Sequence, residues 1–382
     1  MAGDGRFLVD RDGTRHLRVM KGLVLSPRQL LVALAGLAFL VFLPDIAANT
    51  SLSFRTFRKG LLFGIAAIGL NLVLRHTQLV SFGHAAFFGA GAYTAAILAS
   101  TYNVPHTSVL IVGAVVVSTL LGLAIGYLVS GYLDIYFSLL TLAFNGVLFA
   151  LVLGSGFFNY NDGVAVRPAS ANRPLLAGIE FSSEVAGLLN YYISVVLLLV
   201  LLLVTFRIVR SPFGRALDAI GQDRTRARFI GIPVERYVWI VFTMSAVYGG
   251  LAGGLFALLE LHVRPEPTLF IFVSGEILFM AILGGFNTLL GPLVGGLVLV
   301  YVLDLARFVT EFQNALAGVI LLAVVYFLPR GIIGSRSEMY AAARAVREDP
   351  TVLGRWIANI GPLLRRRAAD SAHSMRQLLG MR

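Results

Sequence analysis

Ten apolar stretches, almost free of charged side chains, occupy most of the sequence. They run over residues 30–43, 60–74, 79–100, 107–130, 135–156, 188–206, 237–259, 269–284, 289–303 and 313–328. A helix needs about 20 mainly apolar residues to cross a bilayer, and shorter spans occur where helices are broken. The sequence therefore predicts an all-α polytopic membrane protein with about ten spans, several of them short or broken.

The composition favours a membrane protein over a soluble one. Of the 382 residues, 57% are hydrophobic and 13% are charged, against about 25% charged residues in soluble domains. The chain has no cysteine, which excludes disulfides, thiolate metal sites and a cysteine nucleophile. The net charge of +11 is typical of basic loops at a membrane surface. It is not accompanied by the aromatic–basic pattern that would predict nucleic-acid binding.

The distribution of Lys and Arg predicts the orientation. Ten crossings place both termini on one side, together with loops 75–78, 131–134, 207–236 and 285–288. That side holds 24 of the 31 Lys and Arg residues and the opposite side holds 7. Because basic loops stay in the cytoplasm, both termini are expected there. The predicted organisation is a cytoplasmic segment 1–29, a membrane domain 30–334 and a basic cytoplasmic tail 335–382.

The first span has an alternative interpretation. Residues 30–43 are short and Ala47-Ala48 follow them, as in a cleaved signal peptide. However, the region before them is longer than the usual basic region of a signal peptide. We therefore expect a retained anchor, although the Arg55–Lys59 cluster then lies on the less basic side.

Polar side chains inside spans mark candidate sites, because lipid cannot solvate them. In segment 70–93 they are grouped with small residues that let helices approach closely. Two interpretations stay open: a tight helix crossing whose polar groups satisfy one another, or a broken helix that lines a permeation path. In segment 274–296, Glu276 is the only carboxylate within any predicted span. The helix breaks expected in this segment are Gly284, Gly285, Gly291 and Pro292.

The long loop 207–236 predicts two short helices. Ser211 is a suitable N-cap and Pro212 a suitable first residue. The apolar residues that follow have helical spacing, and a second helix is expected from Asp223 to Ile230, ending at Gly231. An amphipathic helix in a loop needs a surface for its apolar side, and either the membrane interface or a partner protein would provide one.

Nothing in the sequence predicts catalysis. The chain has no G-x-x-x-x-G-K-[ST] motif, and its 6 histidines show no metal-binding spacing. We expect no metal and no cofactor, so any energy coupling must come from an ion gradient or from another subunit. The loop containing Asn159–Gly163 predicts a turn, either a plain connection or a docking surface for an external partner.

Five motifs in a fixed order point to a known family. They are LVSFGHAAFFGAGAY (79–93), TLAF (141–144), RSPFGRALDAIGQD followed by GIPVERY (210–237), SGEILFMAILGGFNTLLGPLVGG (274–296) and FLPRGIIG (327–334). Together they resemble the permease subunits of branched-chain amino-acid (leucine–isoleucine–valine) ABC importers, over roughly residues 60–334. No single motif is specific to this family, but the occurrence of all five in the same order is strong support for the resemblance. Urea and short-amide permeases are close relatives within this family.

The resemblance implies a permease of the plasma (inner) membrane that pairs with a second, homologous permease chain. Two ABC ATPase subunits would bind beneath it and an external substrate-binding protein would deliver substrate, so the chain itself would not be an enzyme. The residues implied in coupling to the ATPase are Arg210, Ser211, Pro212, Phe213, Gly214, Arg215, Ala216, Leu217, Ile220 and Gly231. The residues expected along the substrate path, or at the interface between permeases, are Asn71, Ser81, His84, Asn145 and Glu276.

The resemblance also predicts how the coupling helix is oriented. Its apolar residues are expected to bury against the ATPase, with Arg215 and Asp218 at the rim. These apolar residues are Phe213, Ala216, Leu217 and Ile220. Arg226-Ala227-Arg228 stand where Ala and Glu are common in the family, which suggests an ATPase groove of different charge.

Two departures leave the substrate open. Asn145-Gly146 stand where the family often has an acidic residue, and Asn159–Gly163 replace a Gly-rich turn. The main hypothesis is a permease for branched-chain or related amino acids, and the nearest alternative is one for urea or short amides. A stand-alone channel or ion-coupled carrier is the alternative from another class. The tail, with Trp356 and an arginine run at 365–367, suits either an anionic lipid surface or a solvated tail.

Overall fold

The computed structural model describes most of the membrane domain. The described residues are 8–11, 14–20, 23–25, 27–48, 53–132, 134–167, 181–309, 318–319, 322 and 331–333. Most of the span expected at 313–328, and the whole tail 335–382 with its expected lipid surface, lie outside the described residues.

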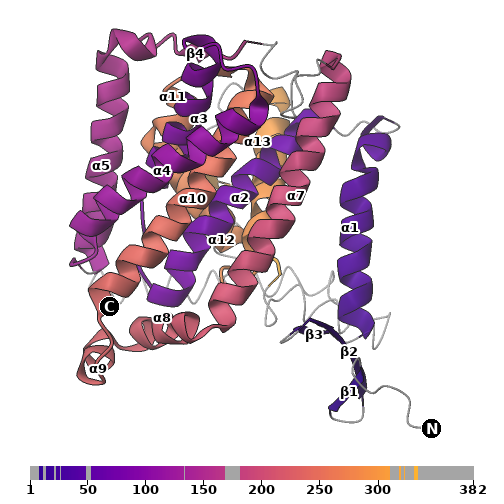
Figure 1. Ribbon diagram of the computed structural model, residues 1–382, viewed down its shortest axis with the longest axis vertical. Coiled ribbons are helices and arrows are strands. Elements are labelled where there is room, and N and C mark those ends of the chain that lie inside the picture. The colour runs from indigo at the N-terminus through magenta and orange to yellow at the C-terminus, as the bar shows by residue number, and fades with distance from the viewer. Residues whose placement is uncertain are drawn as a thin grey trace, which may run out of the picture.

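Helices make up nearly all of the described membrane domain (Figure 1). They are α1 (Pro27–Ala48), α2 (Phe54–Thr77), α3 (His84–Ser100), α4 (Thr107–Val129), α5 (Asp134–Gly154), α7 (Ser183–Arg210), α8 (Pro212–Gln222), α9 (Arg224–Phe229), α10 (Val234–Glu260), α11 (Glu266–Leu269), α12 (Ile271–Gly284) and α13 (Gly291–Val309), with a 3-10 turn at Gly156–Phe158. Five of them, α2, α4, α5, α7 and α10, are long and apolar enough to cross a membrane. This confirms a helical multi-pass membrane protein, while the total of ten spans stays a prediction.

Two short sheets were not expected in an all-α chain. Strands β1 (Leu8–Arg11), β2 (Thr14–Met20) and β3 (Leu23–Leu25) form an antiparallel sheet before α1, with Leu8 opposite Leu17 and Leu17 opposite Leu25. The sequence signal was present, since Leu17 and Val19 alternate with polar residues at the period of a strand. The second sheet pairs β4 (Val164–Ala165) with β5 (His262–Val263).

Two predicted spans have different limits in the structure. The span expected at 60–74 is the 24-residue helix α2, which starts six residues earlier because the Ser53 hydroxyl accepts a hydrogen bond from Thr56 N at 3.3 Å. The span expected at 79–100 starts only at His84, because Gln78 takes a left-handed conformation (φ 57°) that ends α2. As a result, residues 78–83 form a non-helical link within the bundle.

The loops gather at two opposite ends of the bundle. At one end, α8 packs on the end of α2 and α9 follows it (Figure 1). His76 of α2 meets Asp218 of α8 there. At the other end, Arg55 pairs with Glu260 and β4 pairs with β5. The described loops are divided between the two ends as assumed when Lys and Arg were counted on each side. We call the first end the α8–α9 end. Its location in the cytoplasm stays a prediction.

Small residues bring the central helices into direct backbone contact. A Cβ atom at Gly253 would lie 1.8 Å from Phe88 O, and one at Gly91 would lie 2.2 Å from Gly250 O. Such contacts drive helix association where lipid removes the usual hydrophobic advantage. Helices α2 and α10 are accordingly central, with 89% and 83% of their apolar stretches buried, whereas the values for α5 and α7 are 22% and 28%.

We predict that Gly91→Ala destabilises the isolated chain. The added methyl group meets the backbone of Gly250 rather than a movable side chain, and overpacking of this kind costs about 1–3 kcal/mol. The matched control is Gly146→Ala on α5, where a Cβ would meet nothing within 4 Å. Thermal unfolding of the detergent-solubilised chain should show a lower midpoint for Gly91→Ala alone. Equal midpoints for the two variants would contradict this account of the packing.

Candidate functional site

The link between α2 and α3 is held by side chains from other helices. Phe82 N donates to Thr141 Oγ1 at 3.2 Å, and the Ser138 hydroxyl donates to Val80 O at 2.7 Å. On the other side, Ala85 N donates to the hydroxyl of Ser274 on α12 at 2.8 Å. Helices α5 and α12 therefore fix the start of α3.

His84 is the first residue of α3 and directly follows this link. Its Nδ1 lies 3.1 Å from Ser81 Oγ, and its Nε2 forms a hydrogen bond with Ser245 Oγ on α10. The rings of Phe87 and Phe242 meet the imidazole edge-on. Because Ser81 and His84 are fully buried and satisfied by other residues of the chain, they form the tight helix crossing that was one of the two expected arrangements.

The two buried asparagines among the predicted path residues, Asn71 and Asn145, each keep the side-chain oxygen unsatisfied. Asn71 Nδ2 donates to Thr288 O at 3.3 Å, and Asn145 Nδ2 donates to Leu269 O at 3.0 Å. Within the described part of the chain, neither Oδ1 atom accepts a hydrogen bond. A buried acceptor left in this way costs about 1–3 kcal/mol. Asn71 also borders a small pocket, open in part to the outside, next to Arg75 and Leu289.

Glu276 differs from the other four residues because it reaches the surface of the chain. Its side chain is half-buried on α12, on the side that also presents Phe272 and Phe279. Helix α12 ends at Gly284, where a Cβ atom would lie 1.7 Å from Gly291 O. Gly285 (φ 104°) turns the chain, and α13 begins at Gly291 with Pro292 as its second residue.

The two helices expected in the long loop are present as α8 and α9. The Ser211 hydroxyl accepts from Gly214 N at 3.3 Å and caps α8, whose first residue is Pro212. The Asp223 carboxylate accepts from Arg226 N at 3.0 Å and caps α9. Gly231 follows in a left-handed conformation (φ 87°).

The orientation predicted for α8 is wrong. Leu217 and Ile220 are fully buried within the chain itself, and the Phe213 ring stacks on Tyr237 at 5.1 Å. A Cβ atom at Gly221 would lie 2.4 Å from His76 O, so α8 packs directly on the end of α2. The physical reason is that α8 crosses the ends of α2, α7 and α10, whose apolar side chains need a cover.

A different apolar pair is exposed at this end of the molecule. Phe229 is 87% exposed and Ile230 is 73% exposed, at the end of α9. The outward side of α8 carries Arg215 and Asp218, both exposed as expected. The sequence indicated the exposure of this pair only weakly. Phe229-Ile230 stand in a basic segment and do not belong to the apolar side of an amphipathic helix.

Polar contacts fasten α8 and α9 to two membrane helices. His76 Nδ1 lies 2.5 Å from Asp218 Oδ1. The Arg224 guanidinium donates to Asp134 Oδ1 at 3.2 Å, on α5, and to Thr77 O at 3.0 Å, on α2. Burial lowers the pKa of the Arg224 guanidinium, and the charge of Asp134 opposes that shift. We call Arg224, Asp134 and the Asp218–His76 pair the α8–α9 clamp.

No metal centre is found in the part of the chain that the structure describes, where no three His, Asp or Glu side chains gather in a suitable cluster.

Comparison with known proteins gives consistent results. Residues 52–329 match the family model described as the permease component of branched-chain amino acid transport systems. The high-affinity branched-chain amino acid permease LivM of Salmonella typhimurium is 27% identical over 80% of this chain and 75% of its own length. LivM of Escherichia coli K12 is 26% identical over 83% and 77%, and LivH of S. typhimurium is 25% identical over 78% and 96%. No solved structure matches. Because the family model covers most of the sequence, the chain belongs to the permease components of branched-chain amino acid transport systems.

Proposed function

We propose that this chain forms, together with a second homologous permease, the translocation path of an ATP-driven importer for branched-chain or related amino acids. The likeness to both LivM and LivH supports such a pair, because these are two different permeases. Two ABC ATPases and an external substrate-binding protein complete the proposed complex in the plasma (inner) membrane. The single observation that carries the proposal is the family match over residues 52–329.

The proposed path runs along the outer side of α12. Glu276 is partly exposed there, and a carboxylate that faced lipid at the centre of a helix would cost about 2.5–3.5 kcal/mol. A water-filled path or the second permease removes that cost. We expect Asn71, Ser81, His84 and Asn145 to support the path from within the chain, where all four are buried.

We expect Glu276→Gln to lower substrate uptake by about tenfold or more, equivalent to about 1.4 kcal/mol of lost stabilisation. The variant keeps the shape of the side chain and removes its charge. Glu184→Gln is the control, because Glu184 is exposed in the first turn of α7. Uptake is measured in vesicles that hold the full complex, and pull-down of the second permease checks assembly. Unchanged uptake in Glu276→Gln would remove Glu276 from the path.

The proposed ATPase docking surface is α9 with the outward side of α8. Phe229 and Ile230 are the only neighbouring pair of large apolar residues in the described α8–α9 segment with both side chains mostly exposed. Aromatic residues are favoured anchors in protein interfaces. The exposed basic residues of α9 surround this pair and suit an acidic rim on the ATPase.

The α8–α9 clamp gives this surface a connection to the membrane. Asp218 holds α8 to His76, and Arg224 holds α9 to both Asp134 and Thr77. A displacement of α9 by the ATPase would therefore move the end of α2 and the start of α5 together. Helix α2 carries Asn71, and α5 closes the link before α3.

Phe229→Ala should weaken ATPase binding by about thirtyfold and abolish transport-stimulated ATP hydrolysis. An anchor at the centre of an interface contributes about 2 kcal/mol or more. The matched control is Phe157→Ala, since Phe157 is an exposed phenylalanine at the opposite end of the molecule. Binding is measured by pull-down of the purified ATPase at graded concentrations. If both variants bind equally well, α9 is not the docking element.

Arg224→Gln should loosen the clamp without unfolding the bundle. We expect faster hydrogen exchange in residues 223–231, because the contacts to Asp134 and Thr77 are lost. Arg226→Gln is the control, since the Arg226 side chain is 87% exposed and pairs with Asp223, the N-cap residue of its own helix. Exchange followed by mass spectrometry separates the two variants. Equal exchange in both would show that Arg224 does not fasten α9.

The substrate and the class of transporter can be tested in one assay. Vesicles with the complete complex should accumulate leucine only with ATP, and excess leucine should compete better than urea. Better competition by urea would favour the short-amide alternative. ATP-independent flux through this chain alone would favour a channel or ion-coupled carrier and contradict the proposal.

A further inference from the structure

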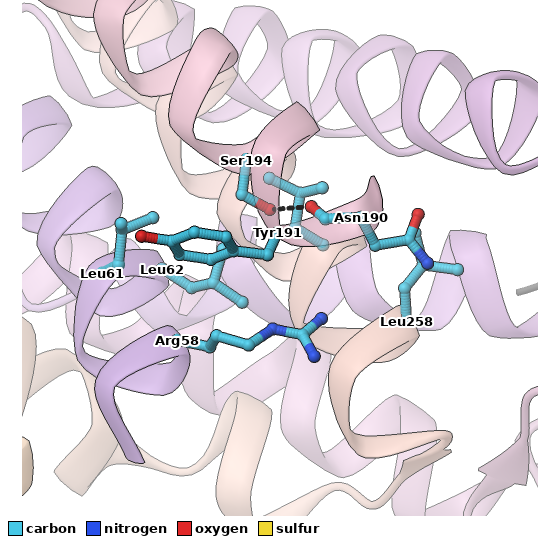
Figure 2. A pocket seen from close by; sticks show the side chains of 8 residues that line it. Arg58, Leu61, Leu62, Asn190, Tyr191, Ser194 and Leu258 are labelled. Atoms are coloured by element: carbon cyan, nitrogen blue, oxygen red, sulfur yellow. Dashed lines mark hydrogen bonds between the residues drawn. The ribbon is translucent and has the colours of Figure 1, made fainter. Parts of the chain in front are cut away.

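We propose that Arg58 forms a binding site for the phosphate of a phospholipid headgroup, at the end of the bundle opposite α8 and α9. The site lies between α2, α7 and α10, as Figure 2 shows. None of the residues that line it belongs to the proposed substrate path, so the two sites are separate.

Arg58 is a largely enclosed cation that no acidic side chain balances. Its guanidinium carbon lies 5.6 Å from the centre of the Phe54 ring. Among the described residues no carboxylate pairs with it, whereas Arg55, one turn earlier on α2, pairs with Glu260. A charge held away from water without a counter-ion is costly. An anionic ligand would remove this cost.

The pocket beside Arg58 combines apolar walls with a polar floor. Four leucines of α2 and α10 line it, and Asn190 and Ser194 of α7 complete it (Figure 2). Its empty volume is about 260 Å³, part of which is open to the outside. The Ser194 hydroxyl donates to Asn190 O at 2.7 Å and the Tyr191 hydroxyl donates to Leu40 O at 2.6 Å. These hydroxyls are engaged within the protein, so Arg58 is the charged donor that the pocket offers.

Gly187 leaves this donor uncovered. A Cβ atom at Gly187 would have a single described heavy atom within 4 Å, which is Arg58 Nη1 at 3.8 Å. Any larger residue there would stand over the guanidinium. The glycine therefore provides access from the outer surface of α7.

The surroundings favour a phospholipid over a small free anion. Leu188, Tyr192, Val196 and Val200 are exposed at helical spacing along α7 and form an apolar strip suited to acyl chains, beside α1, where the Tyr192 hydroxyl donates to Val41 O at 3.2 Å. Tyrosine is enriched where membrane and water meet, and guanidinium groups bind phosphate oxygens in a two-pronged geometry. A free amino acid or inorganic phosphate would pair with Arg58 but gain nothing from the strip.

The test is lipid binding to the purified full chain in detergent, followed by native mass spectrometry with phosphatidylglycerol as the probe. We expect Arg58→Gln to weaken binding by about tenfold or more, as for loss of a charged hydrogen-bond partner. Arg55→Gln is the control, because its charge is already paired with Glu260. Gly187→Leu keeps both charges and should also weaken binding, and it decides the question if Arg58→Gln does not fold.

Three results would overturn the proposal. Equal losses in Arg55→Gln and Arg58→Gln would indicate general surface charge. Unchanged binding in Gly187→Leu would show that access does not pass this glycine. Displacement of the lipid by equimolar leucine or inorganic phosphate would assign the site to a free carboxylate or phosphate instead.

Discussion

A break in a membrane helix leaves backbone groups that lipid cannot satisfy, and much of this structure follows from closing two such breaks. Between α2 and α3, hydroxyl groups of Ser138 and Thr141 bind the backbone of the link. Between α12 and α13, Ile332 N and Ile333 N donate to the carbonyls of Leu283 and Gly284. Distant parts of the chain are therefore tied to each other at the points where the helices are interrupted.

These closures require helices that lie unusually near one another. Glycine contacts between α3 and α10, and between α12 and α13, bring the backbones together. The buried polar residues then find partners across the crossing, as His84 does with Ser245. The central helices are therefore buried and the outer helices are more exposed. The outer helices present the surfaces that lipid or other subunits can contact.

The two ends of the molecule have different roles in the proposed complex. At the α8–α9 end, ionic contacts connect an exposed apolar pair to α2 and α5. At the opposite end, the basic cluster that fitted the predicted topology badly has a structural place: Arg55 is paired with Glu260, and Arg58 lies in a pocket between helices. At this end, Arg55 thus fastens two helices together, and Arg58 is the residue that we propose to bind lipid.

The sequence by itself determined the membrane class, most of the helices and the caps of α8 and α9, because hydrophobic runs, Ser211-Pro212 and Gly231 act through local physics. It also identified the family through motifs in a fixed order. Only the tertiary structure decided that Leu217 and Ile220 face the bundle while Phe229 is exposed, since an amphipathic pattern does not say what covers the apolar side. Likewise, the start of α3 and the burial of His84 depend on Ser245 and Thr141, which are distant in sequence. Their contribution becomes visible only when the helices that carry them have packed.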